Sequence, residues 1–380
     1  MYYYVHHTSS FPRNTGIQRC VRSIFAALIG RGCGLRPVVW DQSAGELKAA
    51  SRHQRQHLAR WNGPPIGAWA DHSQEPLSYC NWLLIVELVS GPFHPTVQQL
   101  RQEVNRRCLK VAWVFHDALP LSSGAERSVA CHSAYMAGLA SFELVLANSE
   151  ASARVLGRFL LERGHSPTKL QQLVRALPLA TEFPGSPRSV PIAQRPEGDQ
   201  LRLLTVSSLE PRKNHLGLLK AMAALGAQGA FPAELVLVGW ANDPRVVALV
   251  QRVLQLGLPL RWEADVDDDR LGELYRWCDF TVYPSLEEGF GLPVAESLWQ
   301  KRPCLCSGEG ALGELAKGGG CLPVNTNDWR HLAAGLGRLL QDPALRRQLS
   351  QEASDRPVRP WGRYAQELLM ALDQRSTAAL

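Results

Sequence analysis

The 380-residue sequence has no long hydrophobic run. Its longest apolar stretch, NWLLIVELV from Asn81 to Val89, contains Glu87 and is too short to cross a bilayer as a helix. The first ten residues have no basic region followed by an apolar segment, so we expect no secretory signal there. These absences favour a cytoplasmic protein.

The cysteines form no recognisable metal-binding pattern. There are nine of them, and no two are spaced as Cys-x-x-Cys. Cys304 and Cys306 are the closest pair and share one face of an expected strand, but a zinc site needs further ligands at suitable spacing. We therefore expect buried, reduced thiols and no metal ligand among them.

The positive charge is concentrated in the first half of the chain. Residues 1–185 hold 19 Lys and Arg against 12 Asp and Glu, although the net charge of the whole chain is only +6. A basic half suits an anionic membrane surface at the inner face of the membrane or an acidic acceptor, and ordinary solvated arginines are the alternative. The basic helix expected over Ile17–Arg31 is the candidate membrane-facing surface, unless its apolar side packs into the core. Nucleic acid is not expected, because no basic stripe with interleaved aromatic residues occurs.

Two runs of alternating strand and helix patterns predict two domains. We expect a first domain over residues 1–185, a Pro- and Gly-containing linker over 186–200 and a second domain over 201–359. Residues 42–80 are polar and fit neither pattern. The fold class is therefore α/β, with two doubly wound, Rossmann-like domains and ligands bound in a central cleft, beyond the carboxyl ends of the strands.

The segment Tyr283–Trp299 places two carboxylates around a Gly-Phe-Gly-Leu-Pro turn. A helix is expected to begin near Leu292, where unpaired N–H groups suit a phosphate. Glu288 on the loop and Glu296 in the first helical turn are predicted to accept hydrogen bonds from hydroxyl groups on either side of that phosphate. A sugar and a ribose joined by a diphosphate have this composition. The alternative is a favourable first-turn acid and a solvated loop residue.

A second polar segment, VSSLEPRKNHLGLL from Val206 to Leu219, follows the first strand of the second domain. Arg212 and Lys213 precede a helix that Asn214 is predicted to cap. Two cations beside a helix start can bind a diphosphate, the arginine as a fork and the lysine as a point charge.

Two further sequence patterns could indicate a metal site or a general base, and each also has a simpler structural explanation. Asp265–Asp269 contains the Asp-x-Asp pattern that can hold a diphosphate through a divalent metal, but it also precedes a helix, where acidic residues cap and complement the dipole. His116 and Asp117 could form a general-base pair, or the histidine could only orient a loop.

These segments resemble the retaining glycosyltransferases of family 4, which have the GT-B fold. EGFGLPVAE is similar to the family's signature of two glutamates separated by seven residues, and SLEPRKN is similar to its diphosphate segment. NTGIQRCVR and VFHDALPL resemble the glycine loop and the His-bearing loop of the first domain. RPWGRYAQELLMAL resembles the C-terminal helix, about 360–380, that packs back on that domain. Ser207-Ser208 replaces a frequent Gly-Arg pair, and the first loop has a single glycine.

The resemblance implies a role for each matching residue. Arg212 and Lys213 would neutralise the leaving diphosphate, and Glu288 would orient the donor sugar. The other implied donor contacts are Glu296 with the ribose, His116 with the transferred sugar, Gly16 with the diphosphate, Val266 through its backbone with the base, and the main chain of Gly289, Phe290, Gly291 and Leu292 with the sugar and its phosphate.

We therefore expect a retaining, metal-independent glycosyltransferase without a cofactor. It would move a hexose from a nucleotide diphosphate sugar to a saccharide or lipid-linked acceptor in surface polysaccharide synthesis. SLEPRKN is most similar to the mannosyl- and rhamnosyltransferase branch, which makes GDP-mannose the first donor to consider. The alternatives are a rhamnosyl- or glucosyltransferase with a dTDP or UDP donor, a sugar-nucleotide epimerase or hydrolase of the same fold, and an inactive scaffold.

Overall fold

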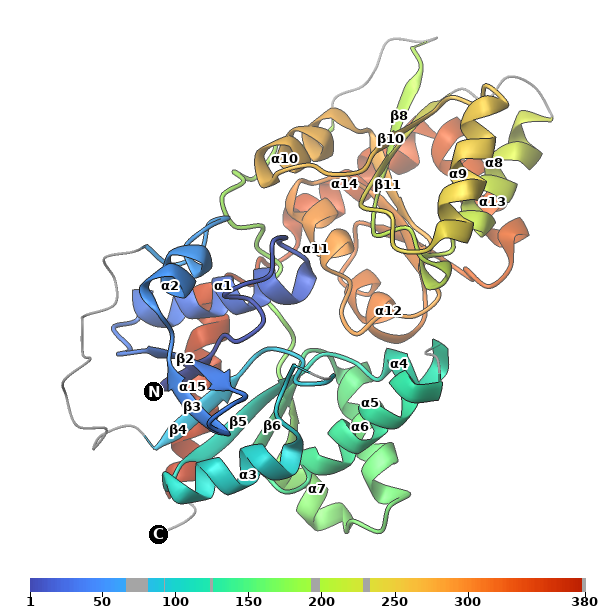
Figure 1. The fold of residues 1–380 in the computed structure, drawn as a ribbon. Coiled ribbons are helices and arrows are strands. Elements are labelled where there is room, and N and C mark those ends of the chain that lie inside the picture. Colours follow the sequence, from blue (N-terminus) through green and yellow to red (C-terminus); the bar gives the residue numbers. More distant parts are fainter. Residues whose placement is uncertain (66–80, 92, 124–125, 193–198, 228–232, 378–380) are drawn as a thin grey trace. The chain divides into compact units, whose positions relative to one another are not determined.

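The computed structural model describes residues 1–65, 81–91, 93–123, 126–192, 199–227 and 233–377 (Figure 1). Contacts within the chain divide it into two compact units. The first unit comprises Met1–Ala180 with Arg359–Leu380, and the second comprises Thr181–Val358. Each unit is built around its own mainly parallel sheet, as the alternating sequence pattern predicts.

The first unit contains a seven-stranded sheet in the order β3-β2-β1-β4-β5-β6-β7. All neighbouring strands are parallel except β2 and β3, which form an antiparallel pair. The strands are β1 (Tyr2–Tyr4), β2 (Arg36–Asp41), β3 (Glu46–Ala49), β4 (Trp82–Ile85), β5 (Lys110–Phe115), β6 (Leu144–Ala147) and β7 (Val174–Ala176).

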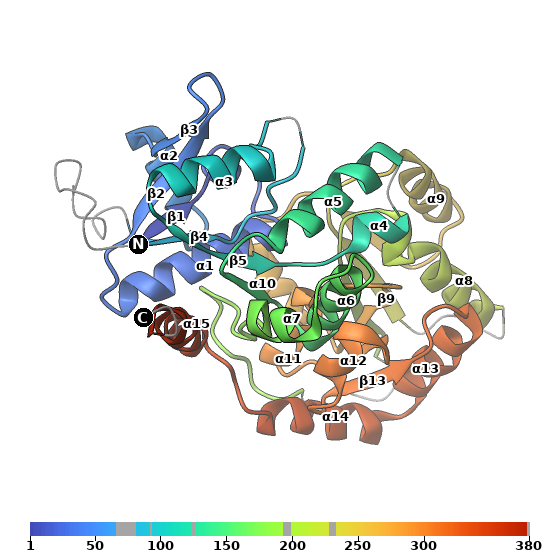
Figure 2. The ribbon, with the colours of Figure 1, turned by 90° about the horizontal axis from the view of Figure 1, so that it is seen from below.

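Helices cover both faces of this sheet. They are α1 (Gly16–Gly30), α2 (Arg52–Leu58), α3 (Val97–Arg106), α4 (Leu119–Ser123), α5 (Glu126–Leu139), α6 (Glu150–Leu161), α7 (Pro167–Leu173) and α15 (Trp361–Thr377). Figure 2 shows α3 on one side of the strands and α1 with α15 on the other. The side chains of β1 alternate accordingly. Tyr4 joins the core cluster that contains Leu100 of α3, whereas Tyr3 contacts Phe25 of α1 edge-on.

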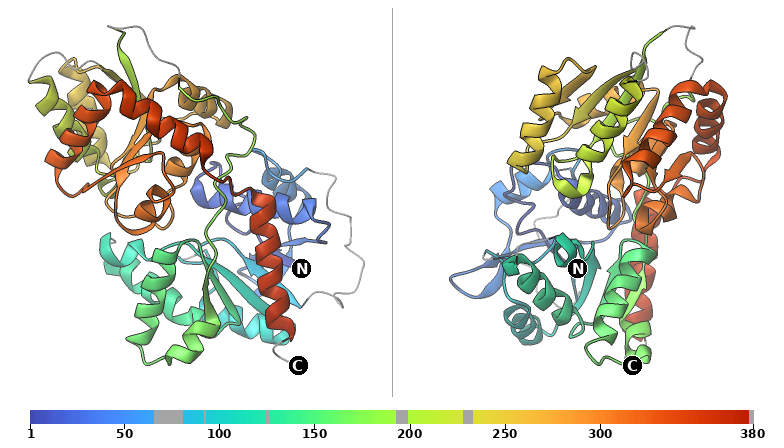
Figure 3. Two further views of the ribbon diagram at one scale, coloured as in Figure 1. Left: turned by 180° about the vertical axis from the view of Figure 1, so that it is seen from behind. Right: turned by 90° about the vertical axis from the view of Figure 1, so that its right-hand side faces the viewer.

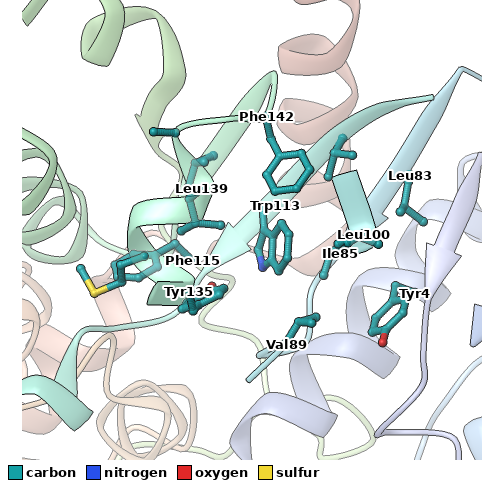
Figure 4. Packing of buried hydrophobic residues seen from close by; sticks show 14 of the residues in the cluster. Tyr4, Leu83, Ile85, Val89, Leu100, Trp113, Phe115, Tyr135, Leu139 and Phe142 are labelled. Atoms are coloured by element: carbon teal, nitrogen blue, oxygen red, sulfur yellow. The ribbon is translucent and has the colours of Figure 1, made fainter. Parts of the chain in front are cut away.

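The core of the first unit is built on the central strands. Every residue from Val111 to Phe115 is fully buried, as expected for a strand that is covered on both faces. The indole of Trp113 packs near Tyr135 of α5 and Phe142, with ring centroids 5.6 and 5.4 Å away (Figure 4).

The C-terminal helix α15 completes the first unit by packing against α1 (Figure 3). The Arg31 side chain, just after α1, donates hydrogen bonds to the Gly362 carbonyl and to Gln366 of α15, at 2.6 and 3.0 Å. The helix α15 therefore packs on the first unit, although it follows the second unit in sequence.

The second unit contains a six-stranded parallel sheet in the order β10-β9-β8-β11-β12-β13. Its strands are β8 (Leu201–Val206), β9 (Ala233–Val238), β10 (Leu260–Glu263), β11 (Phe280–Tyr283), β12 (Cys304–Ser307) and β13 (Cys321–Val324). Cys304, Cys306 and Cys321 are buried free thiols on β12 and β13, in line with the predicted role of Cys304 and Cys306 as small apolar side chains.

Two hydrophobic clusters cover the two faces of the second sheet. Leu203 belongs to a cluster with α8 and α13, and the next residue, Leu204, belongs to a cluster with α10. The helices of the unit are α8 (His215–Gly226), α9 (Pro244–Gln255), α10 (Asp268–Trp277), α11 (Leu292–Trp299), α12 (Gly310–Ala316), α13 (Trp329–Gln341) and α14 (Pro343–Asp355). A short 3-10 helix, η1, covers Pro211–Lys213.

The described part of the segment predicted as a linker is attached to the second unit. Gln300 donates a hydrogen bond to the Ser186 hydroxyl at 2.8 Å, and Arg188 donates one to the Ala353 carbonyl, also at 2.8 Å. Within the unplaced range 42–80, residues 42–65 contain β3 and α2, and residues 66–80 lie outside the described part of the chain.

Candidate active site

The loop after β8 is shaped by local hydrogen bonds. Asn214 takes the left-handed conformation (φ 56°), and its side-chain oxygen accepts a hydrogen bond from the Gly217 N–H at 3.1 Å. It therefore caps α8, as predicted. A Cβ at Gly217 would lie 2.5 Å from the Asn214 Oδ1, so only glycine lets the cap approach this closely. Arg212 and Lys213 therefore lie between the carboxyl end of β8 and the capped start of α8.

The loop after β11 lies next to the first loop. The Leu286 N–H donates a hydrogen bond to the Arg212 carbonyl at 2.9 Å, and the Ser285 Oγ lies 3.2 Å from the same oxygen. Gly291 has a φ of 105°, and α11 begins at the next residue, Leu292, as predicted. Gly289 and Phe290 are buried. The two sequence motifs thus form one site at the carboxyl edge of adjacent strands.

Four donors converge on one oxygen of Glu288. Its Oε1 accepts from the Lys213 ammonium at 2.5 Å, the Ser285 hydroxyl at 2.6 Å and the Tyr283 hydroxyl at 2.8 Å, and it lies 3.1 Å from a guanidinium nitrogen of Arg212. The Lys213 and Glu288 side chains are only 8% and 10% exposed. Arg212 is more exposed and also pairs with Glu210 at 2.8 Å.

The ionisation of this cluster follows from burial and neighbouring charge. Burial alone would raise the pKa of Glu288, but the cations of Lys213 and Arg212 outweigh it and hold that pKa at about 2. Burial lowers the pKa of Lys213, and the Glu288 carboxylate opposes this shift. Glu288 is therefore an anion at neutral pH, and each cation has a carboxylate partner.

Glu296 occupies a different position from the one predicted. Because Gly291 is the N-cap and Leu292 the first helical residue, Glu296 lies in the second turn of α11 and not in the first. Its side chain is buried, and its Oε2 accepts a hydrogen bond from the Tyr275 hydroxyl at 2.9 Å. A favourable first-turn acid is therefore not the reason for a glutamate here. Its expected contact with a ribose stays a prediction.

The loop between β10 and α10 carries Val266 and the aspartate run. The Val266 side chain is half-buried and packs against the cluster that contains Leu204. Asp267 caps α10 by accepting from the Arg270 N–H at 2.8 Å, and Asp268 and Asp269 lie in the first turn of the helix. These are the capping and dipole roles considered for the aspartates.

The remaining predicted residues belong to the first unit. His116 follows β5, is buried, and its Nε2 lies 2.5 Å from the Val86 carbonyl. Burial lowers the pKa of His116, so its imidazole is neutral at pH 7. Gly16 is exposed and is the first residue of α1. Both residues follow a first-unit strand or the loop after it, as the resemblance implies.

The candidate membrane-facing helix is part of the core. In α1 the buried residues include Ile24, Phe25 and Leu28, and also Arg22, whose guanidinium donates to Asn14 at 2.9 Å. The apolar side of the helix expected over Ile17–Arg31 therefore packs into the core, which is the alternative that the sequence favours over a membrane-facing surface. Across the described ranges, no helix has the length and hydrophobicity that a bilayer crossing requires.

Sequence reasoning missed four residues that contact the predicted ones: Glu210, Tyr275, Tyr283 and Ser285. Glu210 lies inside the SLEPRKN motif, so its pairing with Arg212 was open to prediction from spacing. The contacts of Tyr275 with Glu296 and of Tyr283 with Lys213 span 21 and 70 residues. No local pattern reports such contacts.

The architecture is that of the GT-B glycosyltransferases. Sucrose-phosphate synthase from Thermosynechococcus elongatus superimposes with a TM-score of 0.70 over 99% of this chain and 99% of that protein, at 19% sequence identity. HepE of Anabaena, in a structure described as a complex with UDP and glucose, gives a TM-score of 0.65 over 98% and 99%, at 16% identity. At these identities the likeness shows the fold.

Sequence comparison supports the same class. Residues 191–356, less than half of the chain, match the family model described as "Glycosyl transferases group 1". O-antigen chain mannosyltransferase B of Escherichia coli is 34% identical over 145 residues, which are 38% of either chain. The serotype-specific mannosyltransferase WbdA of the same species is 27% identical over 314 residues, 77% of this chain and 36% of WbdA. The chain thus spans little more than a third of the length of these relatives.

Proposed function

We propose that the protein is a retaining glycosyltransferase that transfers a hexose from a nucleotide diphosphate sugar to a saccharide or lipid-linked saccharide acceptor. The observation that carries the proposal is the Lys213–Glu288–Arg212 cluster at the carboxyl ends of β8 and β11. Negative charge develops on the diphosphate as the glycosidic bond breaks, so fixed cations stabilise the transition state more than the ground state.

Mannose from GDP-mannose is the first donor to test, with synthesis of a cell-surface polysaccharide as the context. The relatives named as mannosyltransferases support this choice, together with the SLEPRKN segment. Lys213 and Arg212 would supply the countercharge of the diphosphate, so we propose that no metal ion is needed.

The proposal is tested first by nucleotide binding. GDP, UDP, ADP and dTDP are added to the full chain in the presence of EDTA, and the melting temperature is measured. A ligand that binds the native state raises it by mass action. We expect one nucleotide to stabilise the wild type, and Lys213→Ala to lose most of that shift. Lys220→Ala, which removes an exposed lysine of the following helix α8, is the matched control and should keep it.

Product analysis then separates the reaction classes. With GDP-mannose and a mannan oligosaccharide acceptor, we expect GDP release that depends on the acceptor and a product with the anomeric configuration of the donor. Donor consumption without acceptor would favour an epimerase or hydrolase. A nucleotide shift that needs a divalent cation and is unchanged in Lys213→Ala would contradict the proposed mechanism.

A further inference from the structure

The second unit contains two tyrosines, Tyr275 and Tyr283, and each hydroxyl donates a hydrogen bond to one of the two glutamates of the motif. Tyr283 ends β11 and bonds Glu288 at 2.8 Å. Tyr275 lies in α10 and bonds Glu296 at 2.9 Å. Both rings are buried. A tyrosine therefore holds each carboxylate from a neighbouring element of the fold.

Tyr283 also contacts the lysine of the site. The Lys213 ammonium lies 2.9 Å from the Tyr283 hydroxyl and 2.5 Å from the Glu288 Oε1. A tyrosine hydroxyl has one proton, so it donates to the carboxylate and accepts from the ammonium. Burial raises the pKa of Tyr283, so its hydroxyl stays protonated at neutral pH. The three groups form a closed triangle of hydrogen bonds.

This triangle leaves one donor for a ligand. An ammonium group carries three N–H donors. Within the described part of the chain, the Lys213 ammonium has two hydrogen-bond partners, Tyr283 and Glu288. Lysine and glutamate side chains have several rotatable bonds. Because the Tyr283 hydroxyl is hydrogen-bonded to both, it restricts the conformations of Lys213 and Glu288 at once. One N–H of a positioned ammonium is then available for a phosphate oxygen.

Tyr275 is itself fixed in place. Phe183 contacts its ring edge-on with centroids 6.0 Å apart, and the Arg302 guanidinium donates to the Tyr275 carbonyl at 3.0 Å. The hydroxyl also lies 3.3 Å from the Pro293 carbonyl of α11, next to its bond with Glu296. The helix start and the glutamate of α11 are thus tied to the end of α10.

We propose that Tyr283 and Tyr275 are positioning residues with separate tasks. Tyr283 holds Lys213 and Glu288 for the diphosphate and sugar, and Tyr275 holds Glu296 for the nucleoside. This inference rests on the proposed function, because it assumes that a nucleotide diphosphate binds here.

Each tyrosine variant is a control for the other, because Tyr283→Phe and Tyr275→Phe each remove one hydroxyl oxygen from the second unit. Tyr283→Phe and Tyr275→Phe are each titrated with guanosine and with GDP by calorimetry, or with the nucleoside and diphosphate of the base that binds best. We expect Tyr283→Phe to weaken GDP about tenfold and guanosine less than twofold, because a buried donor loses its acceptor at the diphosphate end. Tyr275→Phe should weaken both ligands by the same factor.

A purely structural role would give a different result. Loosened packing would lower the melting temperature and weaken guanosine and GDP alike in both variants, which would overturn the proposal. Tyr364→Phe is the control for loss of a buried hydroxyl, because among the described residues that hydroxyl has no hydrogen-bond partner. It should change neither affinity. If the wild type binds no nucleotide, the proposed function itself fails. If the wild type binds and both variants bind as it does, only the positioning roles fail.

Discussion

Glu288 and Lys213 stabilise each other as ions in a nearly buried site. Two such charges are costly to bury, and removing either partner leaves the other without compensation. The cost of burying a charge is smaller for Arg212, because its side chain is only partly buried and it pairs with a second carboxylate, Glu210. The properties of the site at the residue scale therefore depend on the Glu288–Lys213 pair.

The pKa of Glu288 predicts how acid affects the second unit. Because folding lowers this pKa from 4.5 to about 2, the stabilisation is present above pH 4.5 and is lost as the pH falls towards 2. We expect a loss of about 3 kcal/mol in the free energy of unfolding over that range. Urea denaturation followed at a series of pH values measures it.

Glu288→Gln should be less stable than the wild type at pH 7, by roughly 3–5 kcal/mol, because Lys213 keeps no carboxylate partner. Its stability should also depend less on pH below 4.5. Glu287→Gln changes the adjacent exposed carboxyl and is the matched control. Equal acid sensitivity of the wild type and Glu288→Gln would refute this account.

Gly291, the residue before α11, has a left-handed backbone conformation that joins the loop of Glu288 to the start of the helix. At Gly291, φ is 105°, and a Cβ would lie 2.4 Å from the Cδ2 of Leu312. An L-amino acid side chain is therefore disfavoured both by the backbone conformation and by the neighbouring helix α12. This element boundary supports the site as much as its charged residues do.

Gly291→Ala should destabilise the second unit by roughly 1–3 kcal/mol, since the backbone must strain or Leu312 must move. Thermal unfolding measures the loss, and nucleotide titration should show weaker binding because the N–H groups of α11 shift. Gly226→Ala, at the end of α8, adds a Cβ with no atom within 4 Å and should be close to neutral. A Gly291→Ala protein as stable as Gly226→Ala would argue against this explanation.

Local chemistry explains which elements the sequence predicts. The Asn214 cap and the start of α11 depend on residues a few positions apart, so both were predicted correctly. The prediction that Glu296 lies in the first turn of α11 is wrong, because the position of a residue within a helix depends on which glycine of the loop is the N-cap. The short edge strand β3 alternates polar and apolar residues over only four positions and buries only Leu47, which is too short a pattern to predict a strand. The helix α2 also buries one residue, yet its capping box of Ser51 and Gln54 is a sequence signal that could have revealed it.

At the scale of the whole molecule, the two units bury different titratable groups. The first unit contains imidazoles whose burial lowers their pKa: His6, His7, His57, His94, His116 and His132. It also contains Glu87, whose burial raises its pKa to about 7, although its oxygens accept from the N–H groups of His7 and Thr8 and it lies near Arg22. The second unit has a single imidazole of this kind in its described part, His215.

The buried histidines and Glu87 change the stability of the first unit in opposite directions when the pH falls from 7 to 5. A lowered imidazole pKa gives stability that is present above pH 6.5 and lost on acidification, because the unfolded chain takes up the proton first. A raised carboxyl pKa gives stability that is full below pH 4.5 and lost as the pH rises through 7. Glu87 therefore offsets part of the acid sensitivity of the histidines, by about 3 kcal/mol at most.

Glu87→Gln should remove this offset in the first unit alone. Hydrogen exchange of β5 amides reports opening of the first unit, and exchange of β8 amides reports opening of the second. Between pH 7 and 5 we expect the variant to lose more protection in β5 than the wild type does, with β8 unchanged. Glu126→Gln, an exposed carboxyl at the start of α5, should behave as the wild type. An equal loss in β5 and β8 would mean that the two units open together, because independent units respond only to the groups they bury.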